Sequence, residues 1–483
     1  ADSAGDKALP VPAPAPNQAE FGKDIPRTMR LLASSTPEQR NPVFILYYGQ
    51  SVTNHWPEMV TERLKKRFGH ADLRGENRAI GGFGIPRLLR TAEHDVYPAY
   101  PDLIVLHAYG GSSKVPGSDR TALDQLVANI RSRTTAEIVL WTHHLDHWEP
   151  RRGDSPERTR TAEAQLQARR DKDSECIRQV AAKYGCELVD VRTEWKQFVK
   201  KHDVDSRSLL YDEHIHLKPI AWPLMTELIA RHFRYEKDFR NPWSEAITLQ
   251  PVKADDAGGF EVAFEGNRID LVAAPPKEGQ TLGTARVLID GESPSANPRL
   301  YAITRPSKAP NVWWPAILRI GHTQPLVAED WTLRIDKIDM EAKALAFEVT
   351  GSKTGPDGSG TTDERFVSRS GRVVIEPSDW HLIPGLRWGQ RKGKVPETVE
   401  VTWSVKPMFV DTYRAPDVTD PAQMYLTTAA QGLENRRHVL KVIANGDGAV
   451  PVAAVRVYRP PLSAADAAAG RAPQPKPAAR KGR

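Results

Sequence analysis

The sequence predicts a three-layer α/β domain with a parallel sheet, followed by an all-β sandwich. Three observations predict this. Short apolar runs alternate with helical patterns over residues 42–233, and beyond Asn241 the pattern changes to short strands broken by turn signals. The length of 483 residues also exceeds what one hydrophobic core supports. Apolar strands separated by helices are typical of a parallel sheet covered on both faces.

The elements of the first part can be assigned in order from these patterns. The predicted strands cover residues 43–48, 73–80, 102–108, 137–142 and 187–191. The predicted helices cover residues 53–68, 84–92, 119–133, 157–184, 193–202 and 219–233. Strand and helix therefore alternate regularly, which indicates one domain in which helices connect parallel strands.

The second part is rich in β-forming residues and in turns. Its predicted strands cover residues 260–264, 269–272, 285–289, 399–405 and 438–443, and residues 297–395 form an inserted β subdomain with strands at 331–338, 344–350 and 372–375. The predicted organisation is a Pro/Ala-rich extension (1–28), the α/β domain (29–240), the sandwich (245–462) and a disordered basic tail (463–483).

Composition excludes several classes of function. The 67 basic and 61 acidic residues are interspersed, so the net charge of +6 does not indicate nucleic-acid binding. No apolar run approaches the roughly 18 residues of a membrane span, so we expect no membrane insertion. The chain begins Ala1-Asp2-Ser3 and runs into a Pro/Ala-rich stretch, as after removal of a signal peptide, which predicts a secreted or periplasmic protein. Cys176 and Cys186 either form a disulfide or are two small buried residues.

Ser51 is a candidate nucleophile. It follows the first apolar strand and precedes a helical segment, so it lies at the carboxyl edge of the predicted sheet, where open α/β sheets bind ligands. Its own N–H lies at a helix N-terminus, where free amide donors and the helix dipole favour a developing oxyanion. A serine before a helix is more often only a cap, so a second feature is needed.

The second feature is an acid and a histidine just before the last helix of this domain. Glu213 and His216 are three residues apart on one turn. An imidazole takes the proton of a serine hydroxyl best when a carboxylate holds its tautomer and stabilises the imidazolium. The pair therefore predicts a base for Ser51, with Asp212 as an alternative carboxylate.

These blocks, in this order, resemble the SGNH/GDSL hydrolase superfamily over residues 42–233. Gly49-Gln50-Ser51 corresponds to the Gly-Asp-Ser block of that family, with Gln50 in the Asp position. The run Asn77-Arg78-Ala79-Ile80-Gly81-Gly82 is similar to its second block, which implies that the Gly82 N–H is an oxyanion donor beside the Ser51 N–H. The resemblance implies an acyl-enzyme mechanism with no cofactor.

Two positions depart from the family pattern. The third block of the family carries an Asn whose side chain is an oxyanion donor, and Ser112 occupies that position here. Either the Ser112 hydroxyl or the Gly111 N–H is expected to replace it, because losing one such donor costs about 2.7 to 4 kcal/mol of transition-state stabilisation. The fourth block is Asp-x-x-His, and Glu213 stands in the Asp position. His214 matches the spacing less well than His216.

Further polar and aromatic residues lie in loops at the same predicted edge. We expect them to line the substrate cleft: Gln50, Trp56, Tyr109, His143, His144 and Trp148. The histidines of this region, His107 included, lack the spacing that enforces convergence on a metal, so no metal is expected. The aromatic pair Trp313-Trp314 in the insertion is either a binding platform or core.

The β part resembles, more loosely, the jelly-roll modules of carbohydrate-active enzymes, through the segments 285–291 and 438–443. Together these features predict a serine esterase that removes acyl groups, most simply O-acetyl groups, from a carbohydrate. Two alternatives stay open: a carbohydrate-binding protein whose hydrolase-like domain is catalytically impaired, and a lipid esterase or thioesterase, for which an apolar groove is expected.

Overall fold

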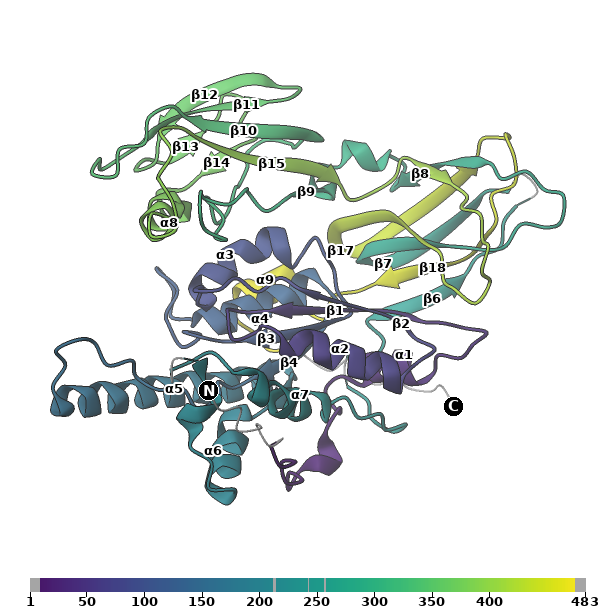
Figure 1. Ribbon diagram of the computed structural model, residues 1–483. Coiled ribbons are helices and arrows are strands. Elements are labelled where there is room, and N and C mark those ends of the chain that lie inside the picture. Colours follow the sequence, from purple (N-terminus) through teal and green to yellow (C-terminus); the bar gives the residue numbers. More distant parts are fainter. Residues whose placement is uncertain (1–8, 212–213, 242, 256–257, 474–483) are drawn as a thin grey trace. The chain divides into compact units, whose positions relative to one another are not determined.

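A computed structural model describes residues 9–211, 214–241, 243–255 and 258–473. The chain divides into two compact units (Figure 1). The first contains residues 1–89, 101–246 and 461–483, and the second contains residues 90–100 and 247–460. No helix among the described residues combines the length and the apolar character that crossing a bilayer requires.

The first unit has the predicted parallel sheet, with strand order β2-β1-β3-β4-β5. Its strands are β1 (Pro42–Tyr48), β2 (Asp72–Asn77), β3 (Leu103–His107), β4 (Glu137–Trp141) and β5 (Glu187–Val189). Its helices are α1 (Pro26–Ala33), α2 (Trp56–Arg67), α4 (Ala122–Arg133), α5 (Pro156–Tyr184), α6 (Val191–Lys201), α7 (Trp222–Ala230) and α9 (Ala464–Ala468). Helix α3 (Ile85–Asp95) begins in the first unit and ends in the second. The predicted fold class is confirmed.

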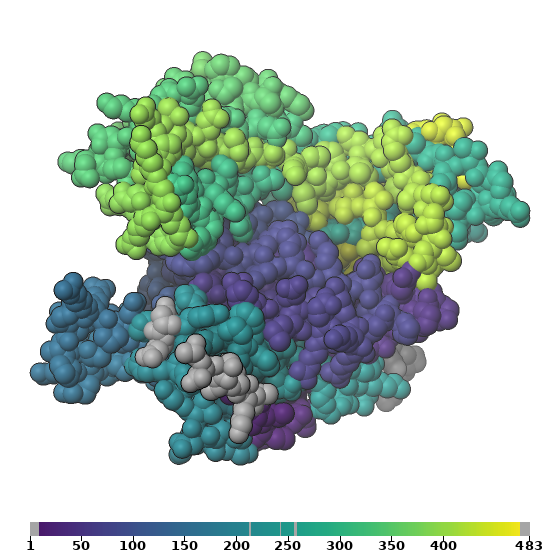
Figure 2. All heavy atoms as spheres, viewed as in Figure 1, coloured from purple at the N-terminus to yellow at the C-terminus, as the bar shows by residue number. Residues whose placement is uncertain are grey.

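Helices cover both faces of this sheet. Alternate residues of β1 face opposite sides: Val43, Ile45 and Tyr47 join the core made with α1, α2, α6 and α7. The Tyr48 hydroxyl, on the other face, donates to the carbonyl of Leu88 in α3. This alternation is the period-two pattern of a strand buried on both sides. The first turns of α5 are mostly exposed and project from the unit (Figures 1 and 2).

Glu137, the first residue of β4, caps the N-terminus of α1 although it lies far from α1 in the sequence. No side chain caps α1 locally. Instead the Glu137 carboxylate accepts the N–H groups of Arg27 at 3.0 Å and Thr28 at 2.7 Å, and the Glu137 side chain is fully buried. A helix N-terminus has unpaired N–H donors and a partial positive charge, so a carboxylate at this point satisfies both.

We expect Glu137→Ala to lower the free energy of unfolding by about 3 kcal/mol, because it leaves buried N–H donors without an acceptor. Urea unfolding followed by circular dichroism measures this loss. Glu137→Gln is the control: its amide oxygen still accepts one of the two bonds, so its loss is smaller. Equal stability of Glu137→Ala and the unmodified protein would contradict this role for Glu137.

The second unit is all-β apart from α3 and α8 (Leu382–Gly389), and its sheets are antiparallel. One sheet has the order β16-β8-β17-β7-β18-β6, from β6 (Ile247–Pro251), β7 (Phe260–Ala273), β8 (Thr284–Ile289), β16 (Thr412–Arg414), β17 (Leu426–Ala444) and β18 (Val452–Tyr458). The other has the order β12-β11-β10-β15-β9, from β9 (Tyr301–Ile303), β10 (Glu329–Ile335), β11 (Ala346–Gly351), β12 (Gly355–Thr361) and β15 (Val399–Pro407). A short hairpin joins β13 (Phe366–Val367) to β14 (Val374–Ile375).

Two details differ from the sequence prediction, and a third decides between two alternatives that it left open. Each large sheet has its own hydrophobic core, and β15 pairs with β10, so the inserted subdomain extends beyond residue 395. The described part of the predicted tail contains α9, whose Ala467 is buried and which packs against α4. Cys176 and Cys186 are buried free thiols without a disulfide. Pairing partners and a buried alanine are tertiary facts that local composition does not reveal.

Candidate active site

Ser51 lies in a tight turn at the carboxyl end of β1. The turn closes through a hydrogen bond from the Thr53 N–H to the Gln50 carbonyl at 2.8 Å. Gly49 has no room for a side chain, because a Cβ atom would lie 2.7 Å from the Thr53 hydroxyl oxygen. The turn places Ser51 ahead of α2 at the edge where a parallel sheet presents its ligand site.

The loop that follows β2 runs alongside this turn. The Asn77 side-chain amide donates to the Thr53 carbonyl at 2.7 Å, and the Ile80 N–H donates to the Gly49 carbonyl at 2.9 Å. Gly82 is exposed and has a φ of 83°, which favours glycine. Within the described residues, the N–H groups of Ser51 and Gly82 have no protein acceptor, so both are available as donors.

His216 reaches Ser51 from a loop far along the chain. An isolated bridge between Leu210 and Leu217 closes this loop, and the Tyr211 N–H donates to the His216 carbonyl at 2.7 Å. Nε2 of His216 lies 2.9 Å from Oγ of Ser51, within hydrogen-bond distance. The structure thus brings the two predicted residues together. The two candidate acids, Asp212 and Glu213, lie outside the described residues.

His214, the weaker candidate base, has another neighbour. Its Nε2 atom lies 3.9 Å from the Glu149 carboxylate.

The Ser112 hydroxyl is not the oxyanion donor that we expected. Both its hydroxyl and its backbone N–H donate to Asp173 in α5, at 2.5 and 3.1 Å. The N–H of Gly110 also donates to that carboxylate, at 3.0 Å. These hydrogen bonds attach the loop after β3 to α5, and the sequence pattern does not reveal them. Gly111 remains the candidate, because its N–H has no acceptor within the described part of the chain.

Four residues expected in the substrate cleft are buried. Trp56 is fully buried and packs edge-on against Tyr47 and Trp141. The side chains of Gln50, His143 and His144 are at most 4% exposed. Because the first residue of an α-helix faces the sheet as readily as solvent, position along the chain does not distinguish core from cleft.

The other two residues expected in the cleft, Tyr109 and Trp148, are half-buried. The guanidinium of Arg170 lies 4.1 Å from the centre of the Tyr109 ring.

An exposed pair of rings beside Ser51 is not among the site residues that the sequence predicts. His55, in the same loop as Ser51, stacks on the Trp222 ring, with the ring centres 4.3 Å apart and the planes at 18°. His55 is exposed with a φ of 67°, and Trp222 is half-buried. Trp222 begins α7, soon after His216. No spacing rule links positions 55 and 222, so only the tertiary structure reveals this pair.

Comparison with known proteins agrees with this geometry. Residues 45–220 match the GDSL-like Lipase/Acylhydrolase family. These residues belong to that family. The first unit is therefore a hydrolase domain that acts on ester bonds, and we call it the acylhydrolase domain. No curated protein sequence matches the chain.

Several solved structures are similar. A catalytic mutant of Axe2, an acetylxylan esterase from Geobacillus stearothermophilus, is 16% identical with a TM-score of 0.33, over 42% of this chain and 98% of that chain. A lipase/acylhydrolase from Enterococcus faecalis is 18% identical with a TM-score of 0.30, over 39% of this chain and 94% of that chain. A two-domain esterase (CEX) active on acetylated mannans, co-crystallized with mannopentaose, is 12% identical with a TM-score of 0.32, over 91% of this chain and 95% of that chain.

Buried ionisable groups lie beneath the reactive pair in the acylhydrolase domain. Burial holds the pKa of His143 below its usual value and those of His107 and His144 well below it. Burial opposes ionisation of Asp146, but His143 and the Arg170 guanidinium outweigh it and lower the pKa of that carboxyl. The three imidazoles are therefore neutral and Asp146 is ionised near neutral pH. Within the described residues, no three His, Cys, Asp or Glu side chains converge on a possible metal position.

These shifts predict that the acylhydrolase domain loses stability in mild acid. Below about pH 6.5 the unfolded histidines take up protons and the folded ones do not, so each lowers the free energy of unfolding by up to about 1.4 kcal/mol per pH unit. Above pH 6.5 this effect disappears. The Asp146 effect is present above the usual aspartate pKa and is lost only at lower pH.

Urea unfolding at pH 7.5 and pH 5.5 measures this loss. His144→Gln, which cannot titrate, is the control and should lose less stability between the two pH values. An unchanged stability over this range would contradict the prediction.

Proposed function

We propose that the acylhydrolase domain is a serine esterase that removes small acyl groups, most simply O-acetyl groups, from a carbohydrate. The 2.9 Å contact between Ser51 Oγ and His216 Nε2 carries this proposal. A serine hydroxyl and an imidazole in this contact are the nucleophile and the base of acyl transfer.

Turnover has two half-reactions, and in each of them His216 accepts one proton and returns it. His216 Nε2 takes the Ser51 proton while Oγ attacks the ester carbonyl carbon, and the resulting oxyanion accepts the N–H groups of Ser51 and Gly82, with Gly111 as a third donor. His216 then returns the proton to the leaving sugar oxygen. A water molecule that loses its proton to His216 then attacks the acyl carbon. His216 returns that proton to Ser51 Oγ as the bond between Oγ and the acyl carbon breaks, which releases the carboxylic acid and restores Ser51. No step requires a cofactor.

The surface beside Ser51 supports a sugar substrate. The exposed loop next to it carries Asn54 and His55, which offer hydrogen-bonding groups, and His55 stacks on Trp222. An aromatic ring with polar groups around it suits a pyranose, which has apolar faces and a polar rim. Acylated polysaccharides occur outside the cytoplasm, and we propose that the protein acts there.

Acetate release from acetylated oligosaccharides tests the substrate class. We expect kcat/KM for acetylated xylo- or manno-oligosaccharides to exceed that for a long-chain fatty acyl aryl ester by at least about 100-fold, because each unaccommodated methylene costs transition-state binding. His55→Ala should lower kcat/KM for the oligosaccharide but not for an aryl acetate. A preference for the long-chain ester would instead favour a lipid esterase.

One observation favours a second candidate, a carbohydrate-binding protein without catalysis. The hydroxyl that takes the position of the family's third oxyanion donor is bonded to Asp173. Covalent labelling by a fluorophosphonate separates the candidates, because only an activated serine reacts. Peptide mapping should find the label on Ser51. Binding of oligosaccharides without any labelling would favour the second candidate.

A further inference from the structure

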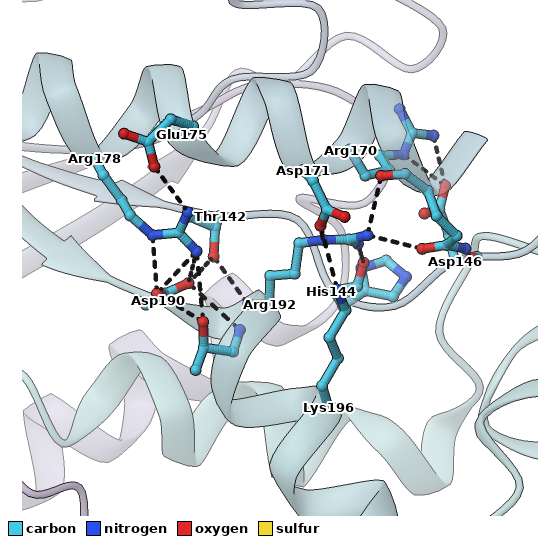
Figure 3. A network of polar contacts seen from close by, with 12 residues as sticks. Thr142, His144, Asp146, Arg170, Asp171, Glu175, Arg178, Asp190, Arg192 and Lys196 are labelled. Atoms are coloured by element: carbon cyan, nitrogen blue, oxygen red, sulfur yellow. Dashed lines mark hydrogen bonds and ion pairs between the residues drawn. The ribbon is translucent and has the colours of Figure 1, made fainter. Parts of the chain in front are cut away.

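A chain of buried polar side chains runs from Gln50 to Arg170. Nε2 of Gln50 lies 2.6 Å from Nδ1 of His107, and Nε2 of His107 lies 3.2 Å from Nδ1 of His143. Nε2 of His143 lies 3.4 Å from the Asp146 carboxylate. Arg170 binds that carboxylate through two nitrogens (Figure 3). All five side chains are at most 5% exposed. The chain ends one residue from Ser51.

The charge on Asp146 determines which nitrogen of His143 is protonated. The Asp146 carboxylate lies 3.4 Å from Nε2 of His143 without making a hydrogen bond to it, and its negative charge favours the proton on that nitrogen over a lone pair there. A neutral imidazole has one N–H, so Nδ1 of His143 accepts from Nε2–H of His107. Nδ1 of His107 is then an acceptor, and the Gln50 amide must turn its NH₂ group toward it. The same reasoning leaves the side-chain oxygen of Gln50, Oε1, buried with no hydrogen-bond partner among the described residues.

The third buried imidazole, that of His144, contacts the backbone just before His216. Nε2 of His144 lies 2.8 Å from the carbonyl oxygen of Ile215, so it is the donor there. Three residues further along, the N–H of His147 donates to the His214 carbonyl at 2.8 Å. The loop after β4 therefore holds the two residues that precede His216.

Both contacts bear on the geometry of acyl transfer. The N–H of Ser51 belongs to the peptide group that joins it to Gln50. The position of Gln50 therefore determines the orientation of this oxyanion donor. The carbonyl of Ile215 belongs to the peptide group that joins it to His216. The hydrogen bond from His144 therefore fixes the backbone from which the His216 side chain extends. Misplacement of reacting groups by about 1 Å costs on the order of 100-fold in rate.

We propose that the histidine cluster, defined as His107, His143 and His144, positions both members of the Ser51–His216 pair. His107 and His143 hold Gln50 in one orientation, and His144 holds Ile215. The cluster does not touch the substrate, so its members are positioning residues. This proposal rests on the esterase function proposed above.

Nitrogen-15 NMR of the histidine-labelled protein tests the proposal without any need for activity. At pH 7.5 we expect His107, His143 and His144 to carry their proton on Nε2, with an unprotonated Nδ1. In Asp146→Asn the acceptor is no longer a carboxylate, and the His143 and His107 signals should move toward a mixture of tautomers. An Nδ1–H tautomer at His107 or His143 in the unmodified protein would overturn the proposal.

Kinetics test the effect on the reactive pair. We expect Asp146→Asn to lower kcat for an aryl acetate, and the rate of fluorophosphonate labelling, by about 10- to 100-fold with little change in KM. The matched control is Asp124→Asn in α4 of the same domain. It also removes a buried carboxylate, one that is paired with Arg120 and Lys183. Equal losses in the two variants would reduce Asp146 to a general contribution to folding and would overturn the proposal.

Two variants of His144 test the second contact. His144→Gln keeps an N–H donor near the Nε2 position and should retain most of kcat, whereas His144→Leu removes the donor and should lose about 10- to 100-fold. Equal rates in these variants, at equal melting temperature, would overturn the role of His144. If the unmodified protein fails to react with fluorophosphonate, the esterase proposal fails. The tautomers of His107 and His143 still decide whether these side chains hold Gln50 in the orientation given above.

Discussion

Ser51→Ala is expected to lower kcat for aryl acetate hydrolysis by on the order of 10,000-fold or more, while the melting temperature stays unchanged. The hydroxyl is the only group at this position that can form the acyl-enzyme, and the residual rate then comes from the oxyanion donors and binding alone. Stability is unaffected because the Ser51 side chain is only partly buried and its partner, His216, keeps its solvent contact. Steady-state kinetics and thermal unfolding of the same preparation measure both effects.

A nearby serine provides the matched control. Ser113 follows β3 at the same edge of the sheet, is exposed, and has only backbone hydrogen bonds within the described residues. Ser113→Ala should keep full activity. If Ser51→Ala retained the rate of Ser113→Ala, Ser51 would not be the nucleophile and the proposed function would fail.

Removal of the proposed acid partner of His216 is the second change for which we expect a large effect. We expect Glu213→Gln to lower kcat by about 10,000-fold, because an amide stabilises the wrong imidazole tautomer and does not stabilise the imidazolium. The residue stands three positions before His216, the spacing at which an acid reaches the ring in the family that the sequence resembles.

Asp212→Asn is the comparison that assigns the acid. With Glu213 as the partner of His216, this neighbouring substitution should cost less than about 10-fold. The reverse order of effects would assign the acid to Asp212. Two small effects would show that neither carboxylate orients His216.

The order of the reactive blocks was predictable because each depends on local features. A glycine-bounded turn after an apolar strand predicts the place of Ser51, and an acid three residues before a histidine predicts a base near the last helix. Parallel strands that share one carboxyl edge then bring the two together. Strands β1, β3 and β4 were predictable for the same reason, since they are buried on both faces and are therefore largely apolar, whereas the edge strand β2 is mostly exposed and polar.

Predictions failed where a contact joins elements that no local pattern connects. The Ser112 hydroxyl was one of two expected oxyanion donors, beside the Gly111 N–H, and it donates to Asp173 of α5 instead. Trp56 was expected in the cleft, and it fills the core against Trp141. The partner of β15 and the packing of α9 against α4 were also decided by distant residues.

By itself the sequence determined the two-part architecture, the alternation of strands and helices in the first part, and the choice of Ser51 and His216 as the candidate reactive pair, because periodicity and motif spacing are properties of neighbouring residues. Only the tertiary structure decided which polar residues lie under the site and which face solvent. Burial depends on packing between segments distant in the chain, and it is burial that keeps the histidine cluster neutral and lets Asp146 direct it.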